Sequence, residues 1–351
     1  MLGGKMRLSV WVILLSAVAL AAPENPILSR YRVVPKSPKA MDSIAEHYEV
    51  LKRDGKAFEV IVPQKDAAHL LSLTESSSLL EADLRDTVRS ALRKWEAGYH
   101  NFELKDTVAK FPTLATLEEY GKSMENRPLL ALKLTGKEAP NKPEIMLTAA
   151  THGDELITVE VLLGLLSQLT KSYGSDSRLT KILDSAVIYF IPVVNPDGYV
   201  RSERYSNGVD PNRDYPWPEK PERNPNPCIK AVINFFHAHA IKGSIDFHAY
   251  GEMIMYPWAY TYSPVSSELH EPLERVTGQM ASHNGYVHGQ ISDVIYVAKG
   301  SSADYYLWKK NTLALGIEMA TTKVPSVSQI PAILKDNTES TWTFIESFLA
   351  P

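Results

Sequence analysis

The sequence predicts an α/β protein in which a mixed β-sheet lies between layers of helices, preceded by a small α+β domain. Three observations lead to this expectation. Apolar runs of strand length alternate with periodic segments of helical length from residue 144 to residue 348. In a shorter stretch, residues 31–84, short apolar runs of strand length also alternate with segments of helical pattern. The 351 residues, 44% of them hydrophobic, suffice for one large core and one small core.

The smaller domain is expected over residues 27–84. Short apolar runs that alternate with polar residues predict its strands, and amphipathic segments predict its helices. The expected order is strand 31–34, helix 41–51, strand 57–62, helix 66–73 and strand 79–84.

A connecting segment, residues 85–98, follows. Arg85, Arg89 and Arg93 would line one face of a helix at this spacing. Basic residues here are candidate cleavage points for an activating protease, although a solvated helix face is the more common explanation for such a pattern.

The large domain is expected over residues 99–351. Residues 186–194 form a continuous apolar run, which is typical of a strand covered on both faces, and residues 195–198 have the chemistry of a turn. The other expected elements are helix 104–111, a hairpin over 114–134, strand 144–150, helix 156–169, helix 229–240, strand 244–247, helix 269–285, helix 302–310, strand 313–319 and helix 330–348.

The N-terminus, residues 1–22, has the features of an export signal. Lys5 and Arg7 precede an apolar core that is too short to span a bilayer comfortably, and cleavage is expected after Ala21 or Ala22. The alternative is an uncleaved anchor. We expect a secreted or periplasmic protein with no membrane association after signal removal.

Charge and cysteine content argue against a nucleic-acid-binding protein and against a disulfide-stabilised one. A formal net charge of −4 gives no support to nucleic-acid binding. Cys228 is the single cysteine, so no intrachain disulfide can form, which favours a bacterial envelope or secreted enzyme.

Two segments carry residues that suit a metal site. His152 and Glu155 lie where a predicted strand turns into a helix, and His248 ends a second predicted strand. Two imidazoles and a carboxylate are the three protein ligands that a catalytic zinc site can have, with the fourth position open. His-x-x-Glu alone is a weak signal, but the second histidine strengthens it.

Several motifs together, in this order, resemble the carboxypeptidase A-like zinc metallocarboxypeptidase family from about Tyr99 to the C-terminus. They are His152-Gly153-Asp154-Glu155, Asn195-Pro196-Asp197-Gly198, Gly208-Val209-Asp210-Pro211-Asn212-Arg213, Phe247-His248-Ala249-Tyr250, Tyr296 and Glu318. The smaller domain resembles the ferredoxin-like pro-domain that shields the cleft of such enzymes until proteolysis. The alternative is an accessory domain that stays attached.

The resemblance implies roles for these residues. His152, Glu155 and His248 would hold one zinc ion, whose bound water attacks the scissile carbonyl. Glu318 would be the general base, since a carboxylate at the end of a buried strand requires a task or a partner. Arg204, with Arg201 as second choice, would stabilise the oxyanion.

Substrate contacts follow from the same resemblance. Asn212 and Arg213 would recognise the free C-terminal carboxylate, and Tyr296 would close over it. Ala303 stands where relatives specific for basic residues carry an acid, so a preference for large apolar or aromatic C-terminal residues is expected. The pocket for the last side chain would be lined by Met255, Ala259, Ile291, Ile295, Ala298, Ala303 and Gly316.

The sequence therefore predicts a monomeric zinc carboxypeptidase acting on the C-termini of peptides or proteins. One alternative is a peptidase of the same fold that cuts peptidoglycan stem peptides. From another class, a non-catalytic binding protein would be expected to lack Glu318 or a metal ligand, and all four residues are present.

Overall fold

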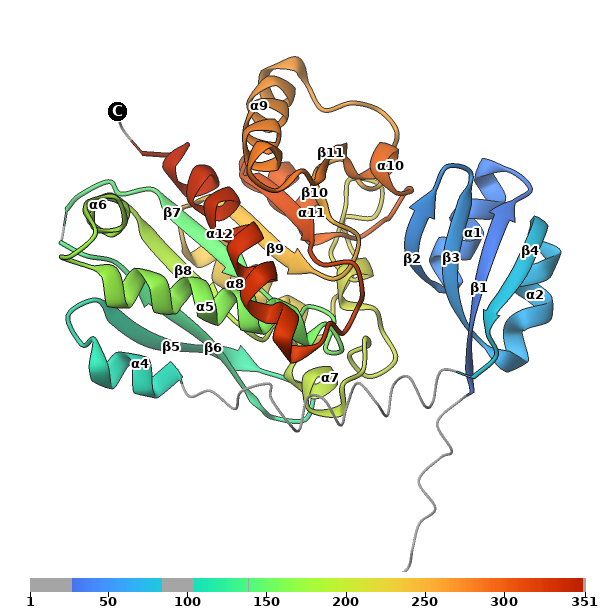
Figure 1. The fold of residues 1–351 in the computed structure, drawn as a ribbon, viewed down its shortest axis with the longest axis horizontal. Helices are drawn as coiled ribbons and strands as arrows, with labels where there is room; N and C mark the ends of the chain where they lie inside the picture. Colours follow the sequence, from blue (N-terminus) through green and yellow to red (C-terminus); the bar gives the residue numbers. More distant parts are fainter. Residues whose placement is uncertain (1–26, 84–103, 138, 350–351) are drawn as a thin grey trace, which may run out of the picture.

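The computed structural model describes residues 27–83, 104–137 and 139–349, which form two domains (Figure 1). The expected signal peptide and connecting segment, and the start of the large domain at residue 99, lie outside the described residues. Among the described helices, none combines the length and apolar character needed to cross a membrane.

The N-terminal domain is a four-stranded antiparallel sheet with two helices. Its sheet order is β2-β3-β1-β4, the ferredoxin-like arrangement, and the predicted fold class is confirmed. The elements are β1 (Leu28–Pro35), α1 (Pro38–His47), β2 (Glu49–Asp54), β3 (Ala57–Pro63), η1 (Gln64–Asp66), α2 (Ala67–Ser72) and β4 (Thr74–Glu81).

The expected helix over residues 41–51 is wrong at its C-terminal end. Helix α1 stops at His47, and the chain continues as strand β2, which pairs with β3. Gly55 opens the tight connection between these strands with φ +62°, a conformation that glycine adopts without strain. The last strand also begins earlier than expected, at Thr74.

The large domain is built on an eight-stranded mixed sheet in the order β11-β10-β12-β9-β7-β8-β6-β5. The strands are β5 (Ala115–Lys122), β6 (Pro128–Leu134), β7 (Glu144–Thr148), β8 (Val187–Ile191), β9 (Ile241–His248), β10 (Met253–Tyr256), β11 (Val287–Gln290) and β12 (Leu313–Glu318). Strands β8, β7, β9 and β12 run parallel to one another. Their carboxyl ends therefore meet at one edge.

Helices cover both faces of this sheet. Ile145 and Leu147 of β7 pack in a cluster with α5, α9 and α12, whereas Met146 packs in a second cluster with α8 and α11. The helices are α4 (Leu104–Lys110), α5 (Leu156–Ser172), α6 (Ser177–Ser185), α7 (Pro196–Arg201), η2 (Pro211–Arg213), α8 (Pro227–Ala238), α9 (Ser267–Asn284), α10 (Ile291–Val294), α11 (Ser302–Lys310), η3 (Val327–Gln329) and α12 (Ile330–Glu346). The alternation confirms the predicted sandwich.

In the large domain, helices α6 and α10 and strands β10 and β11 were not predicted. The expected turn over residues 195–198 is the N-terminus of α7, where the Asn195 side chain accepts a hydrogen bond from the amide of Gly198. Asparagine and proline favour helix starts as well as turns, so the two interpretations share one signal.

Candidate active site

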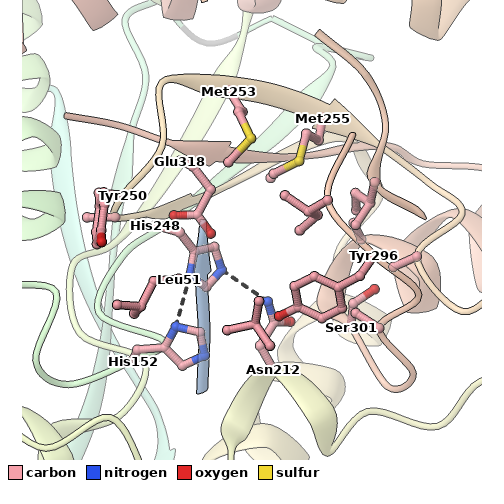
Figure 2. A pocket seen from close by; sticks show the side chains of 18 of the residues that line it. Leu51, His152, Asn212, His248, Tyr250, Met253, Met255, Tyr296, Ser301 and Glu318 are labelled. Carbon is pink, nitrogen blue, oxygen red and sulfur yellow. Dashed lines mark hydrogen bonds between the residues drawn. The ribbon is translucent and has the colours of Figure 1, made fainter. Parts of the chain in front are cut away.

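The three proposed metal ligands meet at the carboxyl edge of the sheet. His152 follows β7, Glu155 is the N-cap of α5, and His248 ends β9; all three are at most 4% exposed. The Nδ1 atoms of the two histidines lie 3.1 Å apart (Figure 2). The Glu155 carboxylate lies 2.7 Å from Nδ1 of His152 and 3.0 Å from Nδ1 of His248.

This donor set fits a zinc ion. The ligand atoms of these three buried residues all lie within 4.8 Å of one another. One zinc ion can bind all three at this spacing, once the histidine nitrogens that face it have lost their protons. Glycine at position 153 is needed for the geometry, because a Cβ there would lie 2.2 Å from the backbone carbon of Gly198. The turn that carries His152 therefore packs directly on α7.

Two further carboxylates orient the histidines. Asp210 lies 3.1 Å from Nε2 of His152, and Asp246 lies 3.1 Å from Nε2 of His248. Such partners fix the ring orientation of metal-binding histidines. The sequence prediction missed both roles, although Asp246 could have been noticed as a charged residue inside a buried strand, two positions before His248 and hence on the same face.

Glu318 lies beside the ligands at the end of β12. The parallel register pairs it with His248, and its Oε2 is buried without a hydrogen-bond partner among the described residues. Burial, assisted by the nearby Glu155 carboxylate, raises the pKa of Glu318 to about 7. A partnerless buried carboxyl beside a metal site is suited to accepting a proton.

The two candidate oxyanion arginines lie in different surroundings. Arg204 is 9% exposed, pairs with Asp210 at 2.9 Å, and brings Nη1 to 3.1 Å from Nδ1 of His152. Arg201 instead pairs with Glu125 and Glu203 at the surface. Of the two, only Arg204 reaches the metal ligands.

Three polar side chains, those of Asn212, Arg213 and Tyr296, lie close together beside the metal ligands. Nη2 of Arg213 donates to the hydroxyl of Tyr296 at 2.8 Å. Nδ2 of Asn212 lies 3.1 Å from Nε2 of His248 (Figure 2). Oδ1 of Asn212 accepts from the amide of Ser302 at 2.9 Å, which fixes the amide plane. The three side chains expected to bind a carboxylate therefore converge.

An apolar pocket lies in the same cavity. Each of the seven residues expected around the last substrate side chain lines the cavity together with His152, Glu155 and His248, and none of the seven carries a charge. The residues of this apolar pocket are Met255, Ala259, Ile291, Ile295, Ala298, Ala303 and Gly316.

Strand β2 of the N-terminal domain also lines this cavity. Glu49, Val50, Leu51 and Arg53 are among the residues that line it, and Figure 2 shows Leu51 beside the histidine pair. Arg53 donates to the carbonyl of Asp293 at 2.9 Å. The small domain is therefore seated on the cavity of the large one.

Comparisons with known proteins agree with this geometry. A family model described as zinc carboxypeptidase matches residues 101–340. A zinc carboxypeptidase from Saccharothrix mutabilis subsp. capreolus is 33% identical over 258 residues, covering 60% of this chain and 59% of its own. Carboxypeptidase A2 from Mus musculus is 30% identical over 240 residues, covering 58% of this chain and 57% of its own. The matched region spans less than three fifths of the length of each relative.

A solved structure has the same fold. Carboxypeptidase A from Helicoverpa armigera superposes with a TM-score of 0.76 over 92% of this chain and 97% of its own, at 19% identity. The matched family model assigns the chain to a family, and the buried His-Glu-His group fits the zinc ion that the name of that family implies. The chain belongs to the zinc carboxypeptidase family, and His152, Glu155 and His248 form its zinc site.

Proposed function

We propose that this protein is an exported, monomeric carboxypeptidase that hydrolyses the C-terminal peptide bond of peptides and prefers large apolar or aromatic C-terminal residues. The observation that carries the proposal is the placement of Asn212, Arg213 and Tyr296 beside the zinc ligands and next to an uncharged pocket. That arrangement suits a free carboxylate and one apolar side chain.

The chain end is held by Arg213 and Asn212. The guanidinium presents two parallel N–H groups to a carboxylate, and the amide adds a neutral donor. The Tyr296 hydroxyl, already bonded to Arg213, covers the same group. Recognition of a carboxylate at this point restricts cleavage to the last peptide bond.

Glu318 moves the proton. When bound, zinc supplies a Lewis acid that polarises the scissile carbonyl and lowers the pKa of water toward about 7. Glu318 accepts a proton from the attacking water as the new C–O bond forms, and it donates that proton to the amine nitrogen as the C–N bond breaks. The Arg204 guanidinium stabilises the negative charge that develops on the carbonyl oxygen.

The apolar pocket sets the preference for the released residue. Ala303 and Gly316 leave space at its wall, and no charged group there favours lysine or glutamate. Apolar pockets discriminate by only about 1–3 kcal/mol per methylene, so selectivity among apolar residues is expected to be graded.

We also propose that residues 27–84 act as a pro-domain, because residues of strand β2 line the cavity that contains the zinc ligands. Cleavage within residues 85–98 by a trypsin-like protease would allow the domain to leave. The basic residues of that segment support this assignment.

The test is release of the C-terminal residue from N-blocked dipeptides ending in Phe, Leu, Lys or Glu. Full-length protein is assayed before and after limited trypsin treatment, with and without a zinc chelator. Zinc-dependent release of Phe and Leu that rises after trypsin supports the proposal. Release only from stem peptides containing D-residues or diaminopimelate would favour the cell-wall alternative, and no release from any substrate would favour a binding protein.

A further inference from the structure

Lys323 is a buried cation at the junction of the two domains. It lies in the loop after β12, and its side chain is 16% exposed. Its ammonium is 2.8 Å from Oδ2 of Asp154 and also contacts Oε1 of Glu49. Burial opposes the charge on Lys323, but these two carboxylates outweigh burial and raise its pKa.

The two carboxylates belong to different domains. Asp154 lies in the large domain beside the zinc ligand Glu155, so this partner is permanent. Glu49 belongs to β2, and its side chain is 9% exposed. Its Oε1 atom also lies 3.6 Å from Nη1 of Arg204. If the N-terminal domain leaves, Lys323 loses Glu49 and keeps Asp154. An ammonium has three donors, so it is then free to bind another anion.

Lys323 contacts Glu49, which lines the cavity of the zinc ligands together with Tyr250. Lys323 is close enough to Tyr250 to act on its phenol electrostatically. Tyr250 and Leu51 lie on one side of the histidine pair, and Tyr296 lies on the other (Figure 2). A peptide whose C-terminal carboxylate is held near Tyr296 would therefore extend past the zinc site toward Lys323.

We propose that Lys323 is a specificity residue that binds an acidic side chain of the substrate on the N-terminal side of the scissile bond. In the full chain Glu49 occupies this subsite as a substitute for that side chain. Asp154 holds the ammonium in place, and the extended β2 backbone carries the glutamate into the cleft. The inference rests on the proposed carboxypeptidase function.

The experiment measures kcat/KM on N-blocked peptides that end in Phe. Glu, Gln, Ala or Lys is placed directly before Phe in one series and one position earlier in a second series. Zinc-loaded full chain is used before and after limited trypsin treatment. Because a hydrogen bond to a charged partner is stronger than one to a neutral partner, Glu is expected to exceed Gln by roughly five- to twentyfold in one series.

Variants assign the preference to Lys323. Lys323→Gln is expected to remove the preference for Glu, Lys323→Arg to retain most of it, and Lys323→Glu to shift the preference to Lys. Lys230→Gln makes the same change in charge at an exposed position of α8 and is expected to leave the preference intact. The ratio of Phe release to Leu release is expected to be unchanged in all four variants, because neither Lys323 nor Lys230 lines the cavity that contains the apolar pocket.

Two outcomes overturn the inference while the proposed function stands. One is equal rates for Glu, Gln and Ala peptides in both series with unmodified protein, a result that needs no variant to fold. The other is a preference for Glu that survives Lys323→Gln, in which case Lys323 serves only to hold the N-terminal domain. Absence of release from every peptide would overturn the inference and the proposed function together.

Discussion

Glu318 is the proposed general base, and replacing it tests that role directly. Glu318→Gln removes the basic oxygen and keeps the shape of the side chain, so kcat is expected to fall by roughly 10²- to 10⁴-fold. Zinc content, measured by metal analysis, is expected to be unchanged because Glu318 is not a ligand. A variant that kept a tenth of the original kcat would contradict the assignment.

The environment of Glu318 also predicts the pH dependence. Burial and the Glu155 carboxylate raise its pKa from 4.5 to about 7, and the positive charge of bound zinc acts in the opposite direction. A base works only when ionised, so kcat/KM is expected to decline as the pH falls, with a midpoint between these two values. A rate that stayed constant from pH 7 to pH 4 would argue against Glu318.

The same shift has a consequence for stability in the metal-free protein. A pKa that is higher in the folded state means that the folded state binds the proton more tightly than the unfolded chain does. The contribution of Glu318 to stability is therefore full below pH 4.5 and lost as the pH rises through about 7.

Among single residues, sequence reasoning identified those with a motif and missed those defined by their neighbours. His152, Glu155 and His248 could be predicted because ligand type and spacing carry the signal. Asp246 could be noticed as a buried charge but not given a role, because its partners Thr148, Thr151 and Ser302 come from two segments far from it in the chain. Lys323 was not singled out for the same reason.

At the scale of elements, the contact between the His152 turn and α7 is a test of packing. Gly153→Ala would force a methyl group against the backbone of Gly198, so the free energy of unfolding is expected to fall by about 1–3 kcal/mol. Zinc affinity should fall as well, because His152 is displaced. Urea unfolding of the metal-free protein and competition with a zinc indicator measure the two effects.

Gly278→Ala is the matched control. Gly278 lies inside α9, where the nearest atom to an added methyl group is a His288 ring carbon at 3.4 Å, an ordinary contact. Alanine is preferred in helix interiors, so this variant is expected to gain roughly 0.5–1 kcal/mol. Equal effects of the two substitutions would show that the turn at Gly153 is not tightly packed.

Strand β2 shows where element prediction failed and why. The apolar residues Met41, Ile44, Tyr48 and Leu51 fit a helical period, and Glu49, Lys52 and Arg53 are good helix formers. Pairing with β3 overrides these local preferences. The Asp54-Gly55 pair was an available hairpin signal, but the position of β2 over the zinc site depends on contacts between domains that no local pattern encodes.

The contacts of Glu49 predict how firmly β2 is held. Glu49→Gln in the full chain removes the charge that contacts Lys323 and Arg204, and the activity of uncut protein is expected to rise by roughly tenfold. Peptide release by uncut protein is the measurement. Glu46→Gln, an exposed change on α1, is the control and is expected to have no effect. An unchanged rate in Glu49→Gln would mean that other β2 contacts suffice.

At the scale of the whole molecule, the fold class and the order of the main elements followed from periodicity and length. Alternating strands and helices predict the central parallel strands β7, β8, β9 and β12, whose apolar runs are long enough to recognise. Strands β10 and β11 have only four residues each, too few to establish a period. They could be placed only by their pairing with β12 and with each other.

Zinc removal tests how far the site supports the large domain. The three ligands join the chain after β7, the start of α5 and the end of β9, so bound zinc connects segments almost a hundred residues apart. At a free zinc concentration 100 times Kd, binding adds about 2.7 kcal/mol to the free energy of unfolding. We therefore expect a chelator to lower the melting temperature measured by calorimetry.

His248→Gln and His283→Gln separate the zinc site from general effects of histidine loss. His248 is a ligand, so its variant is expected to melt at nearly the same temperature with and without chelator. His283 lies on the surface of α9 and bonds to Thr343, so its variant should keep the full response. The response should also weaken as the pH falls, because protons compete with zinc for imidazole and carboxylate ligands. A chelator effect that persisted in His248→Gln would mean that zinc stabilises the protein at another place.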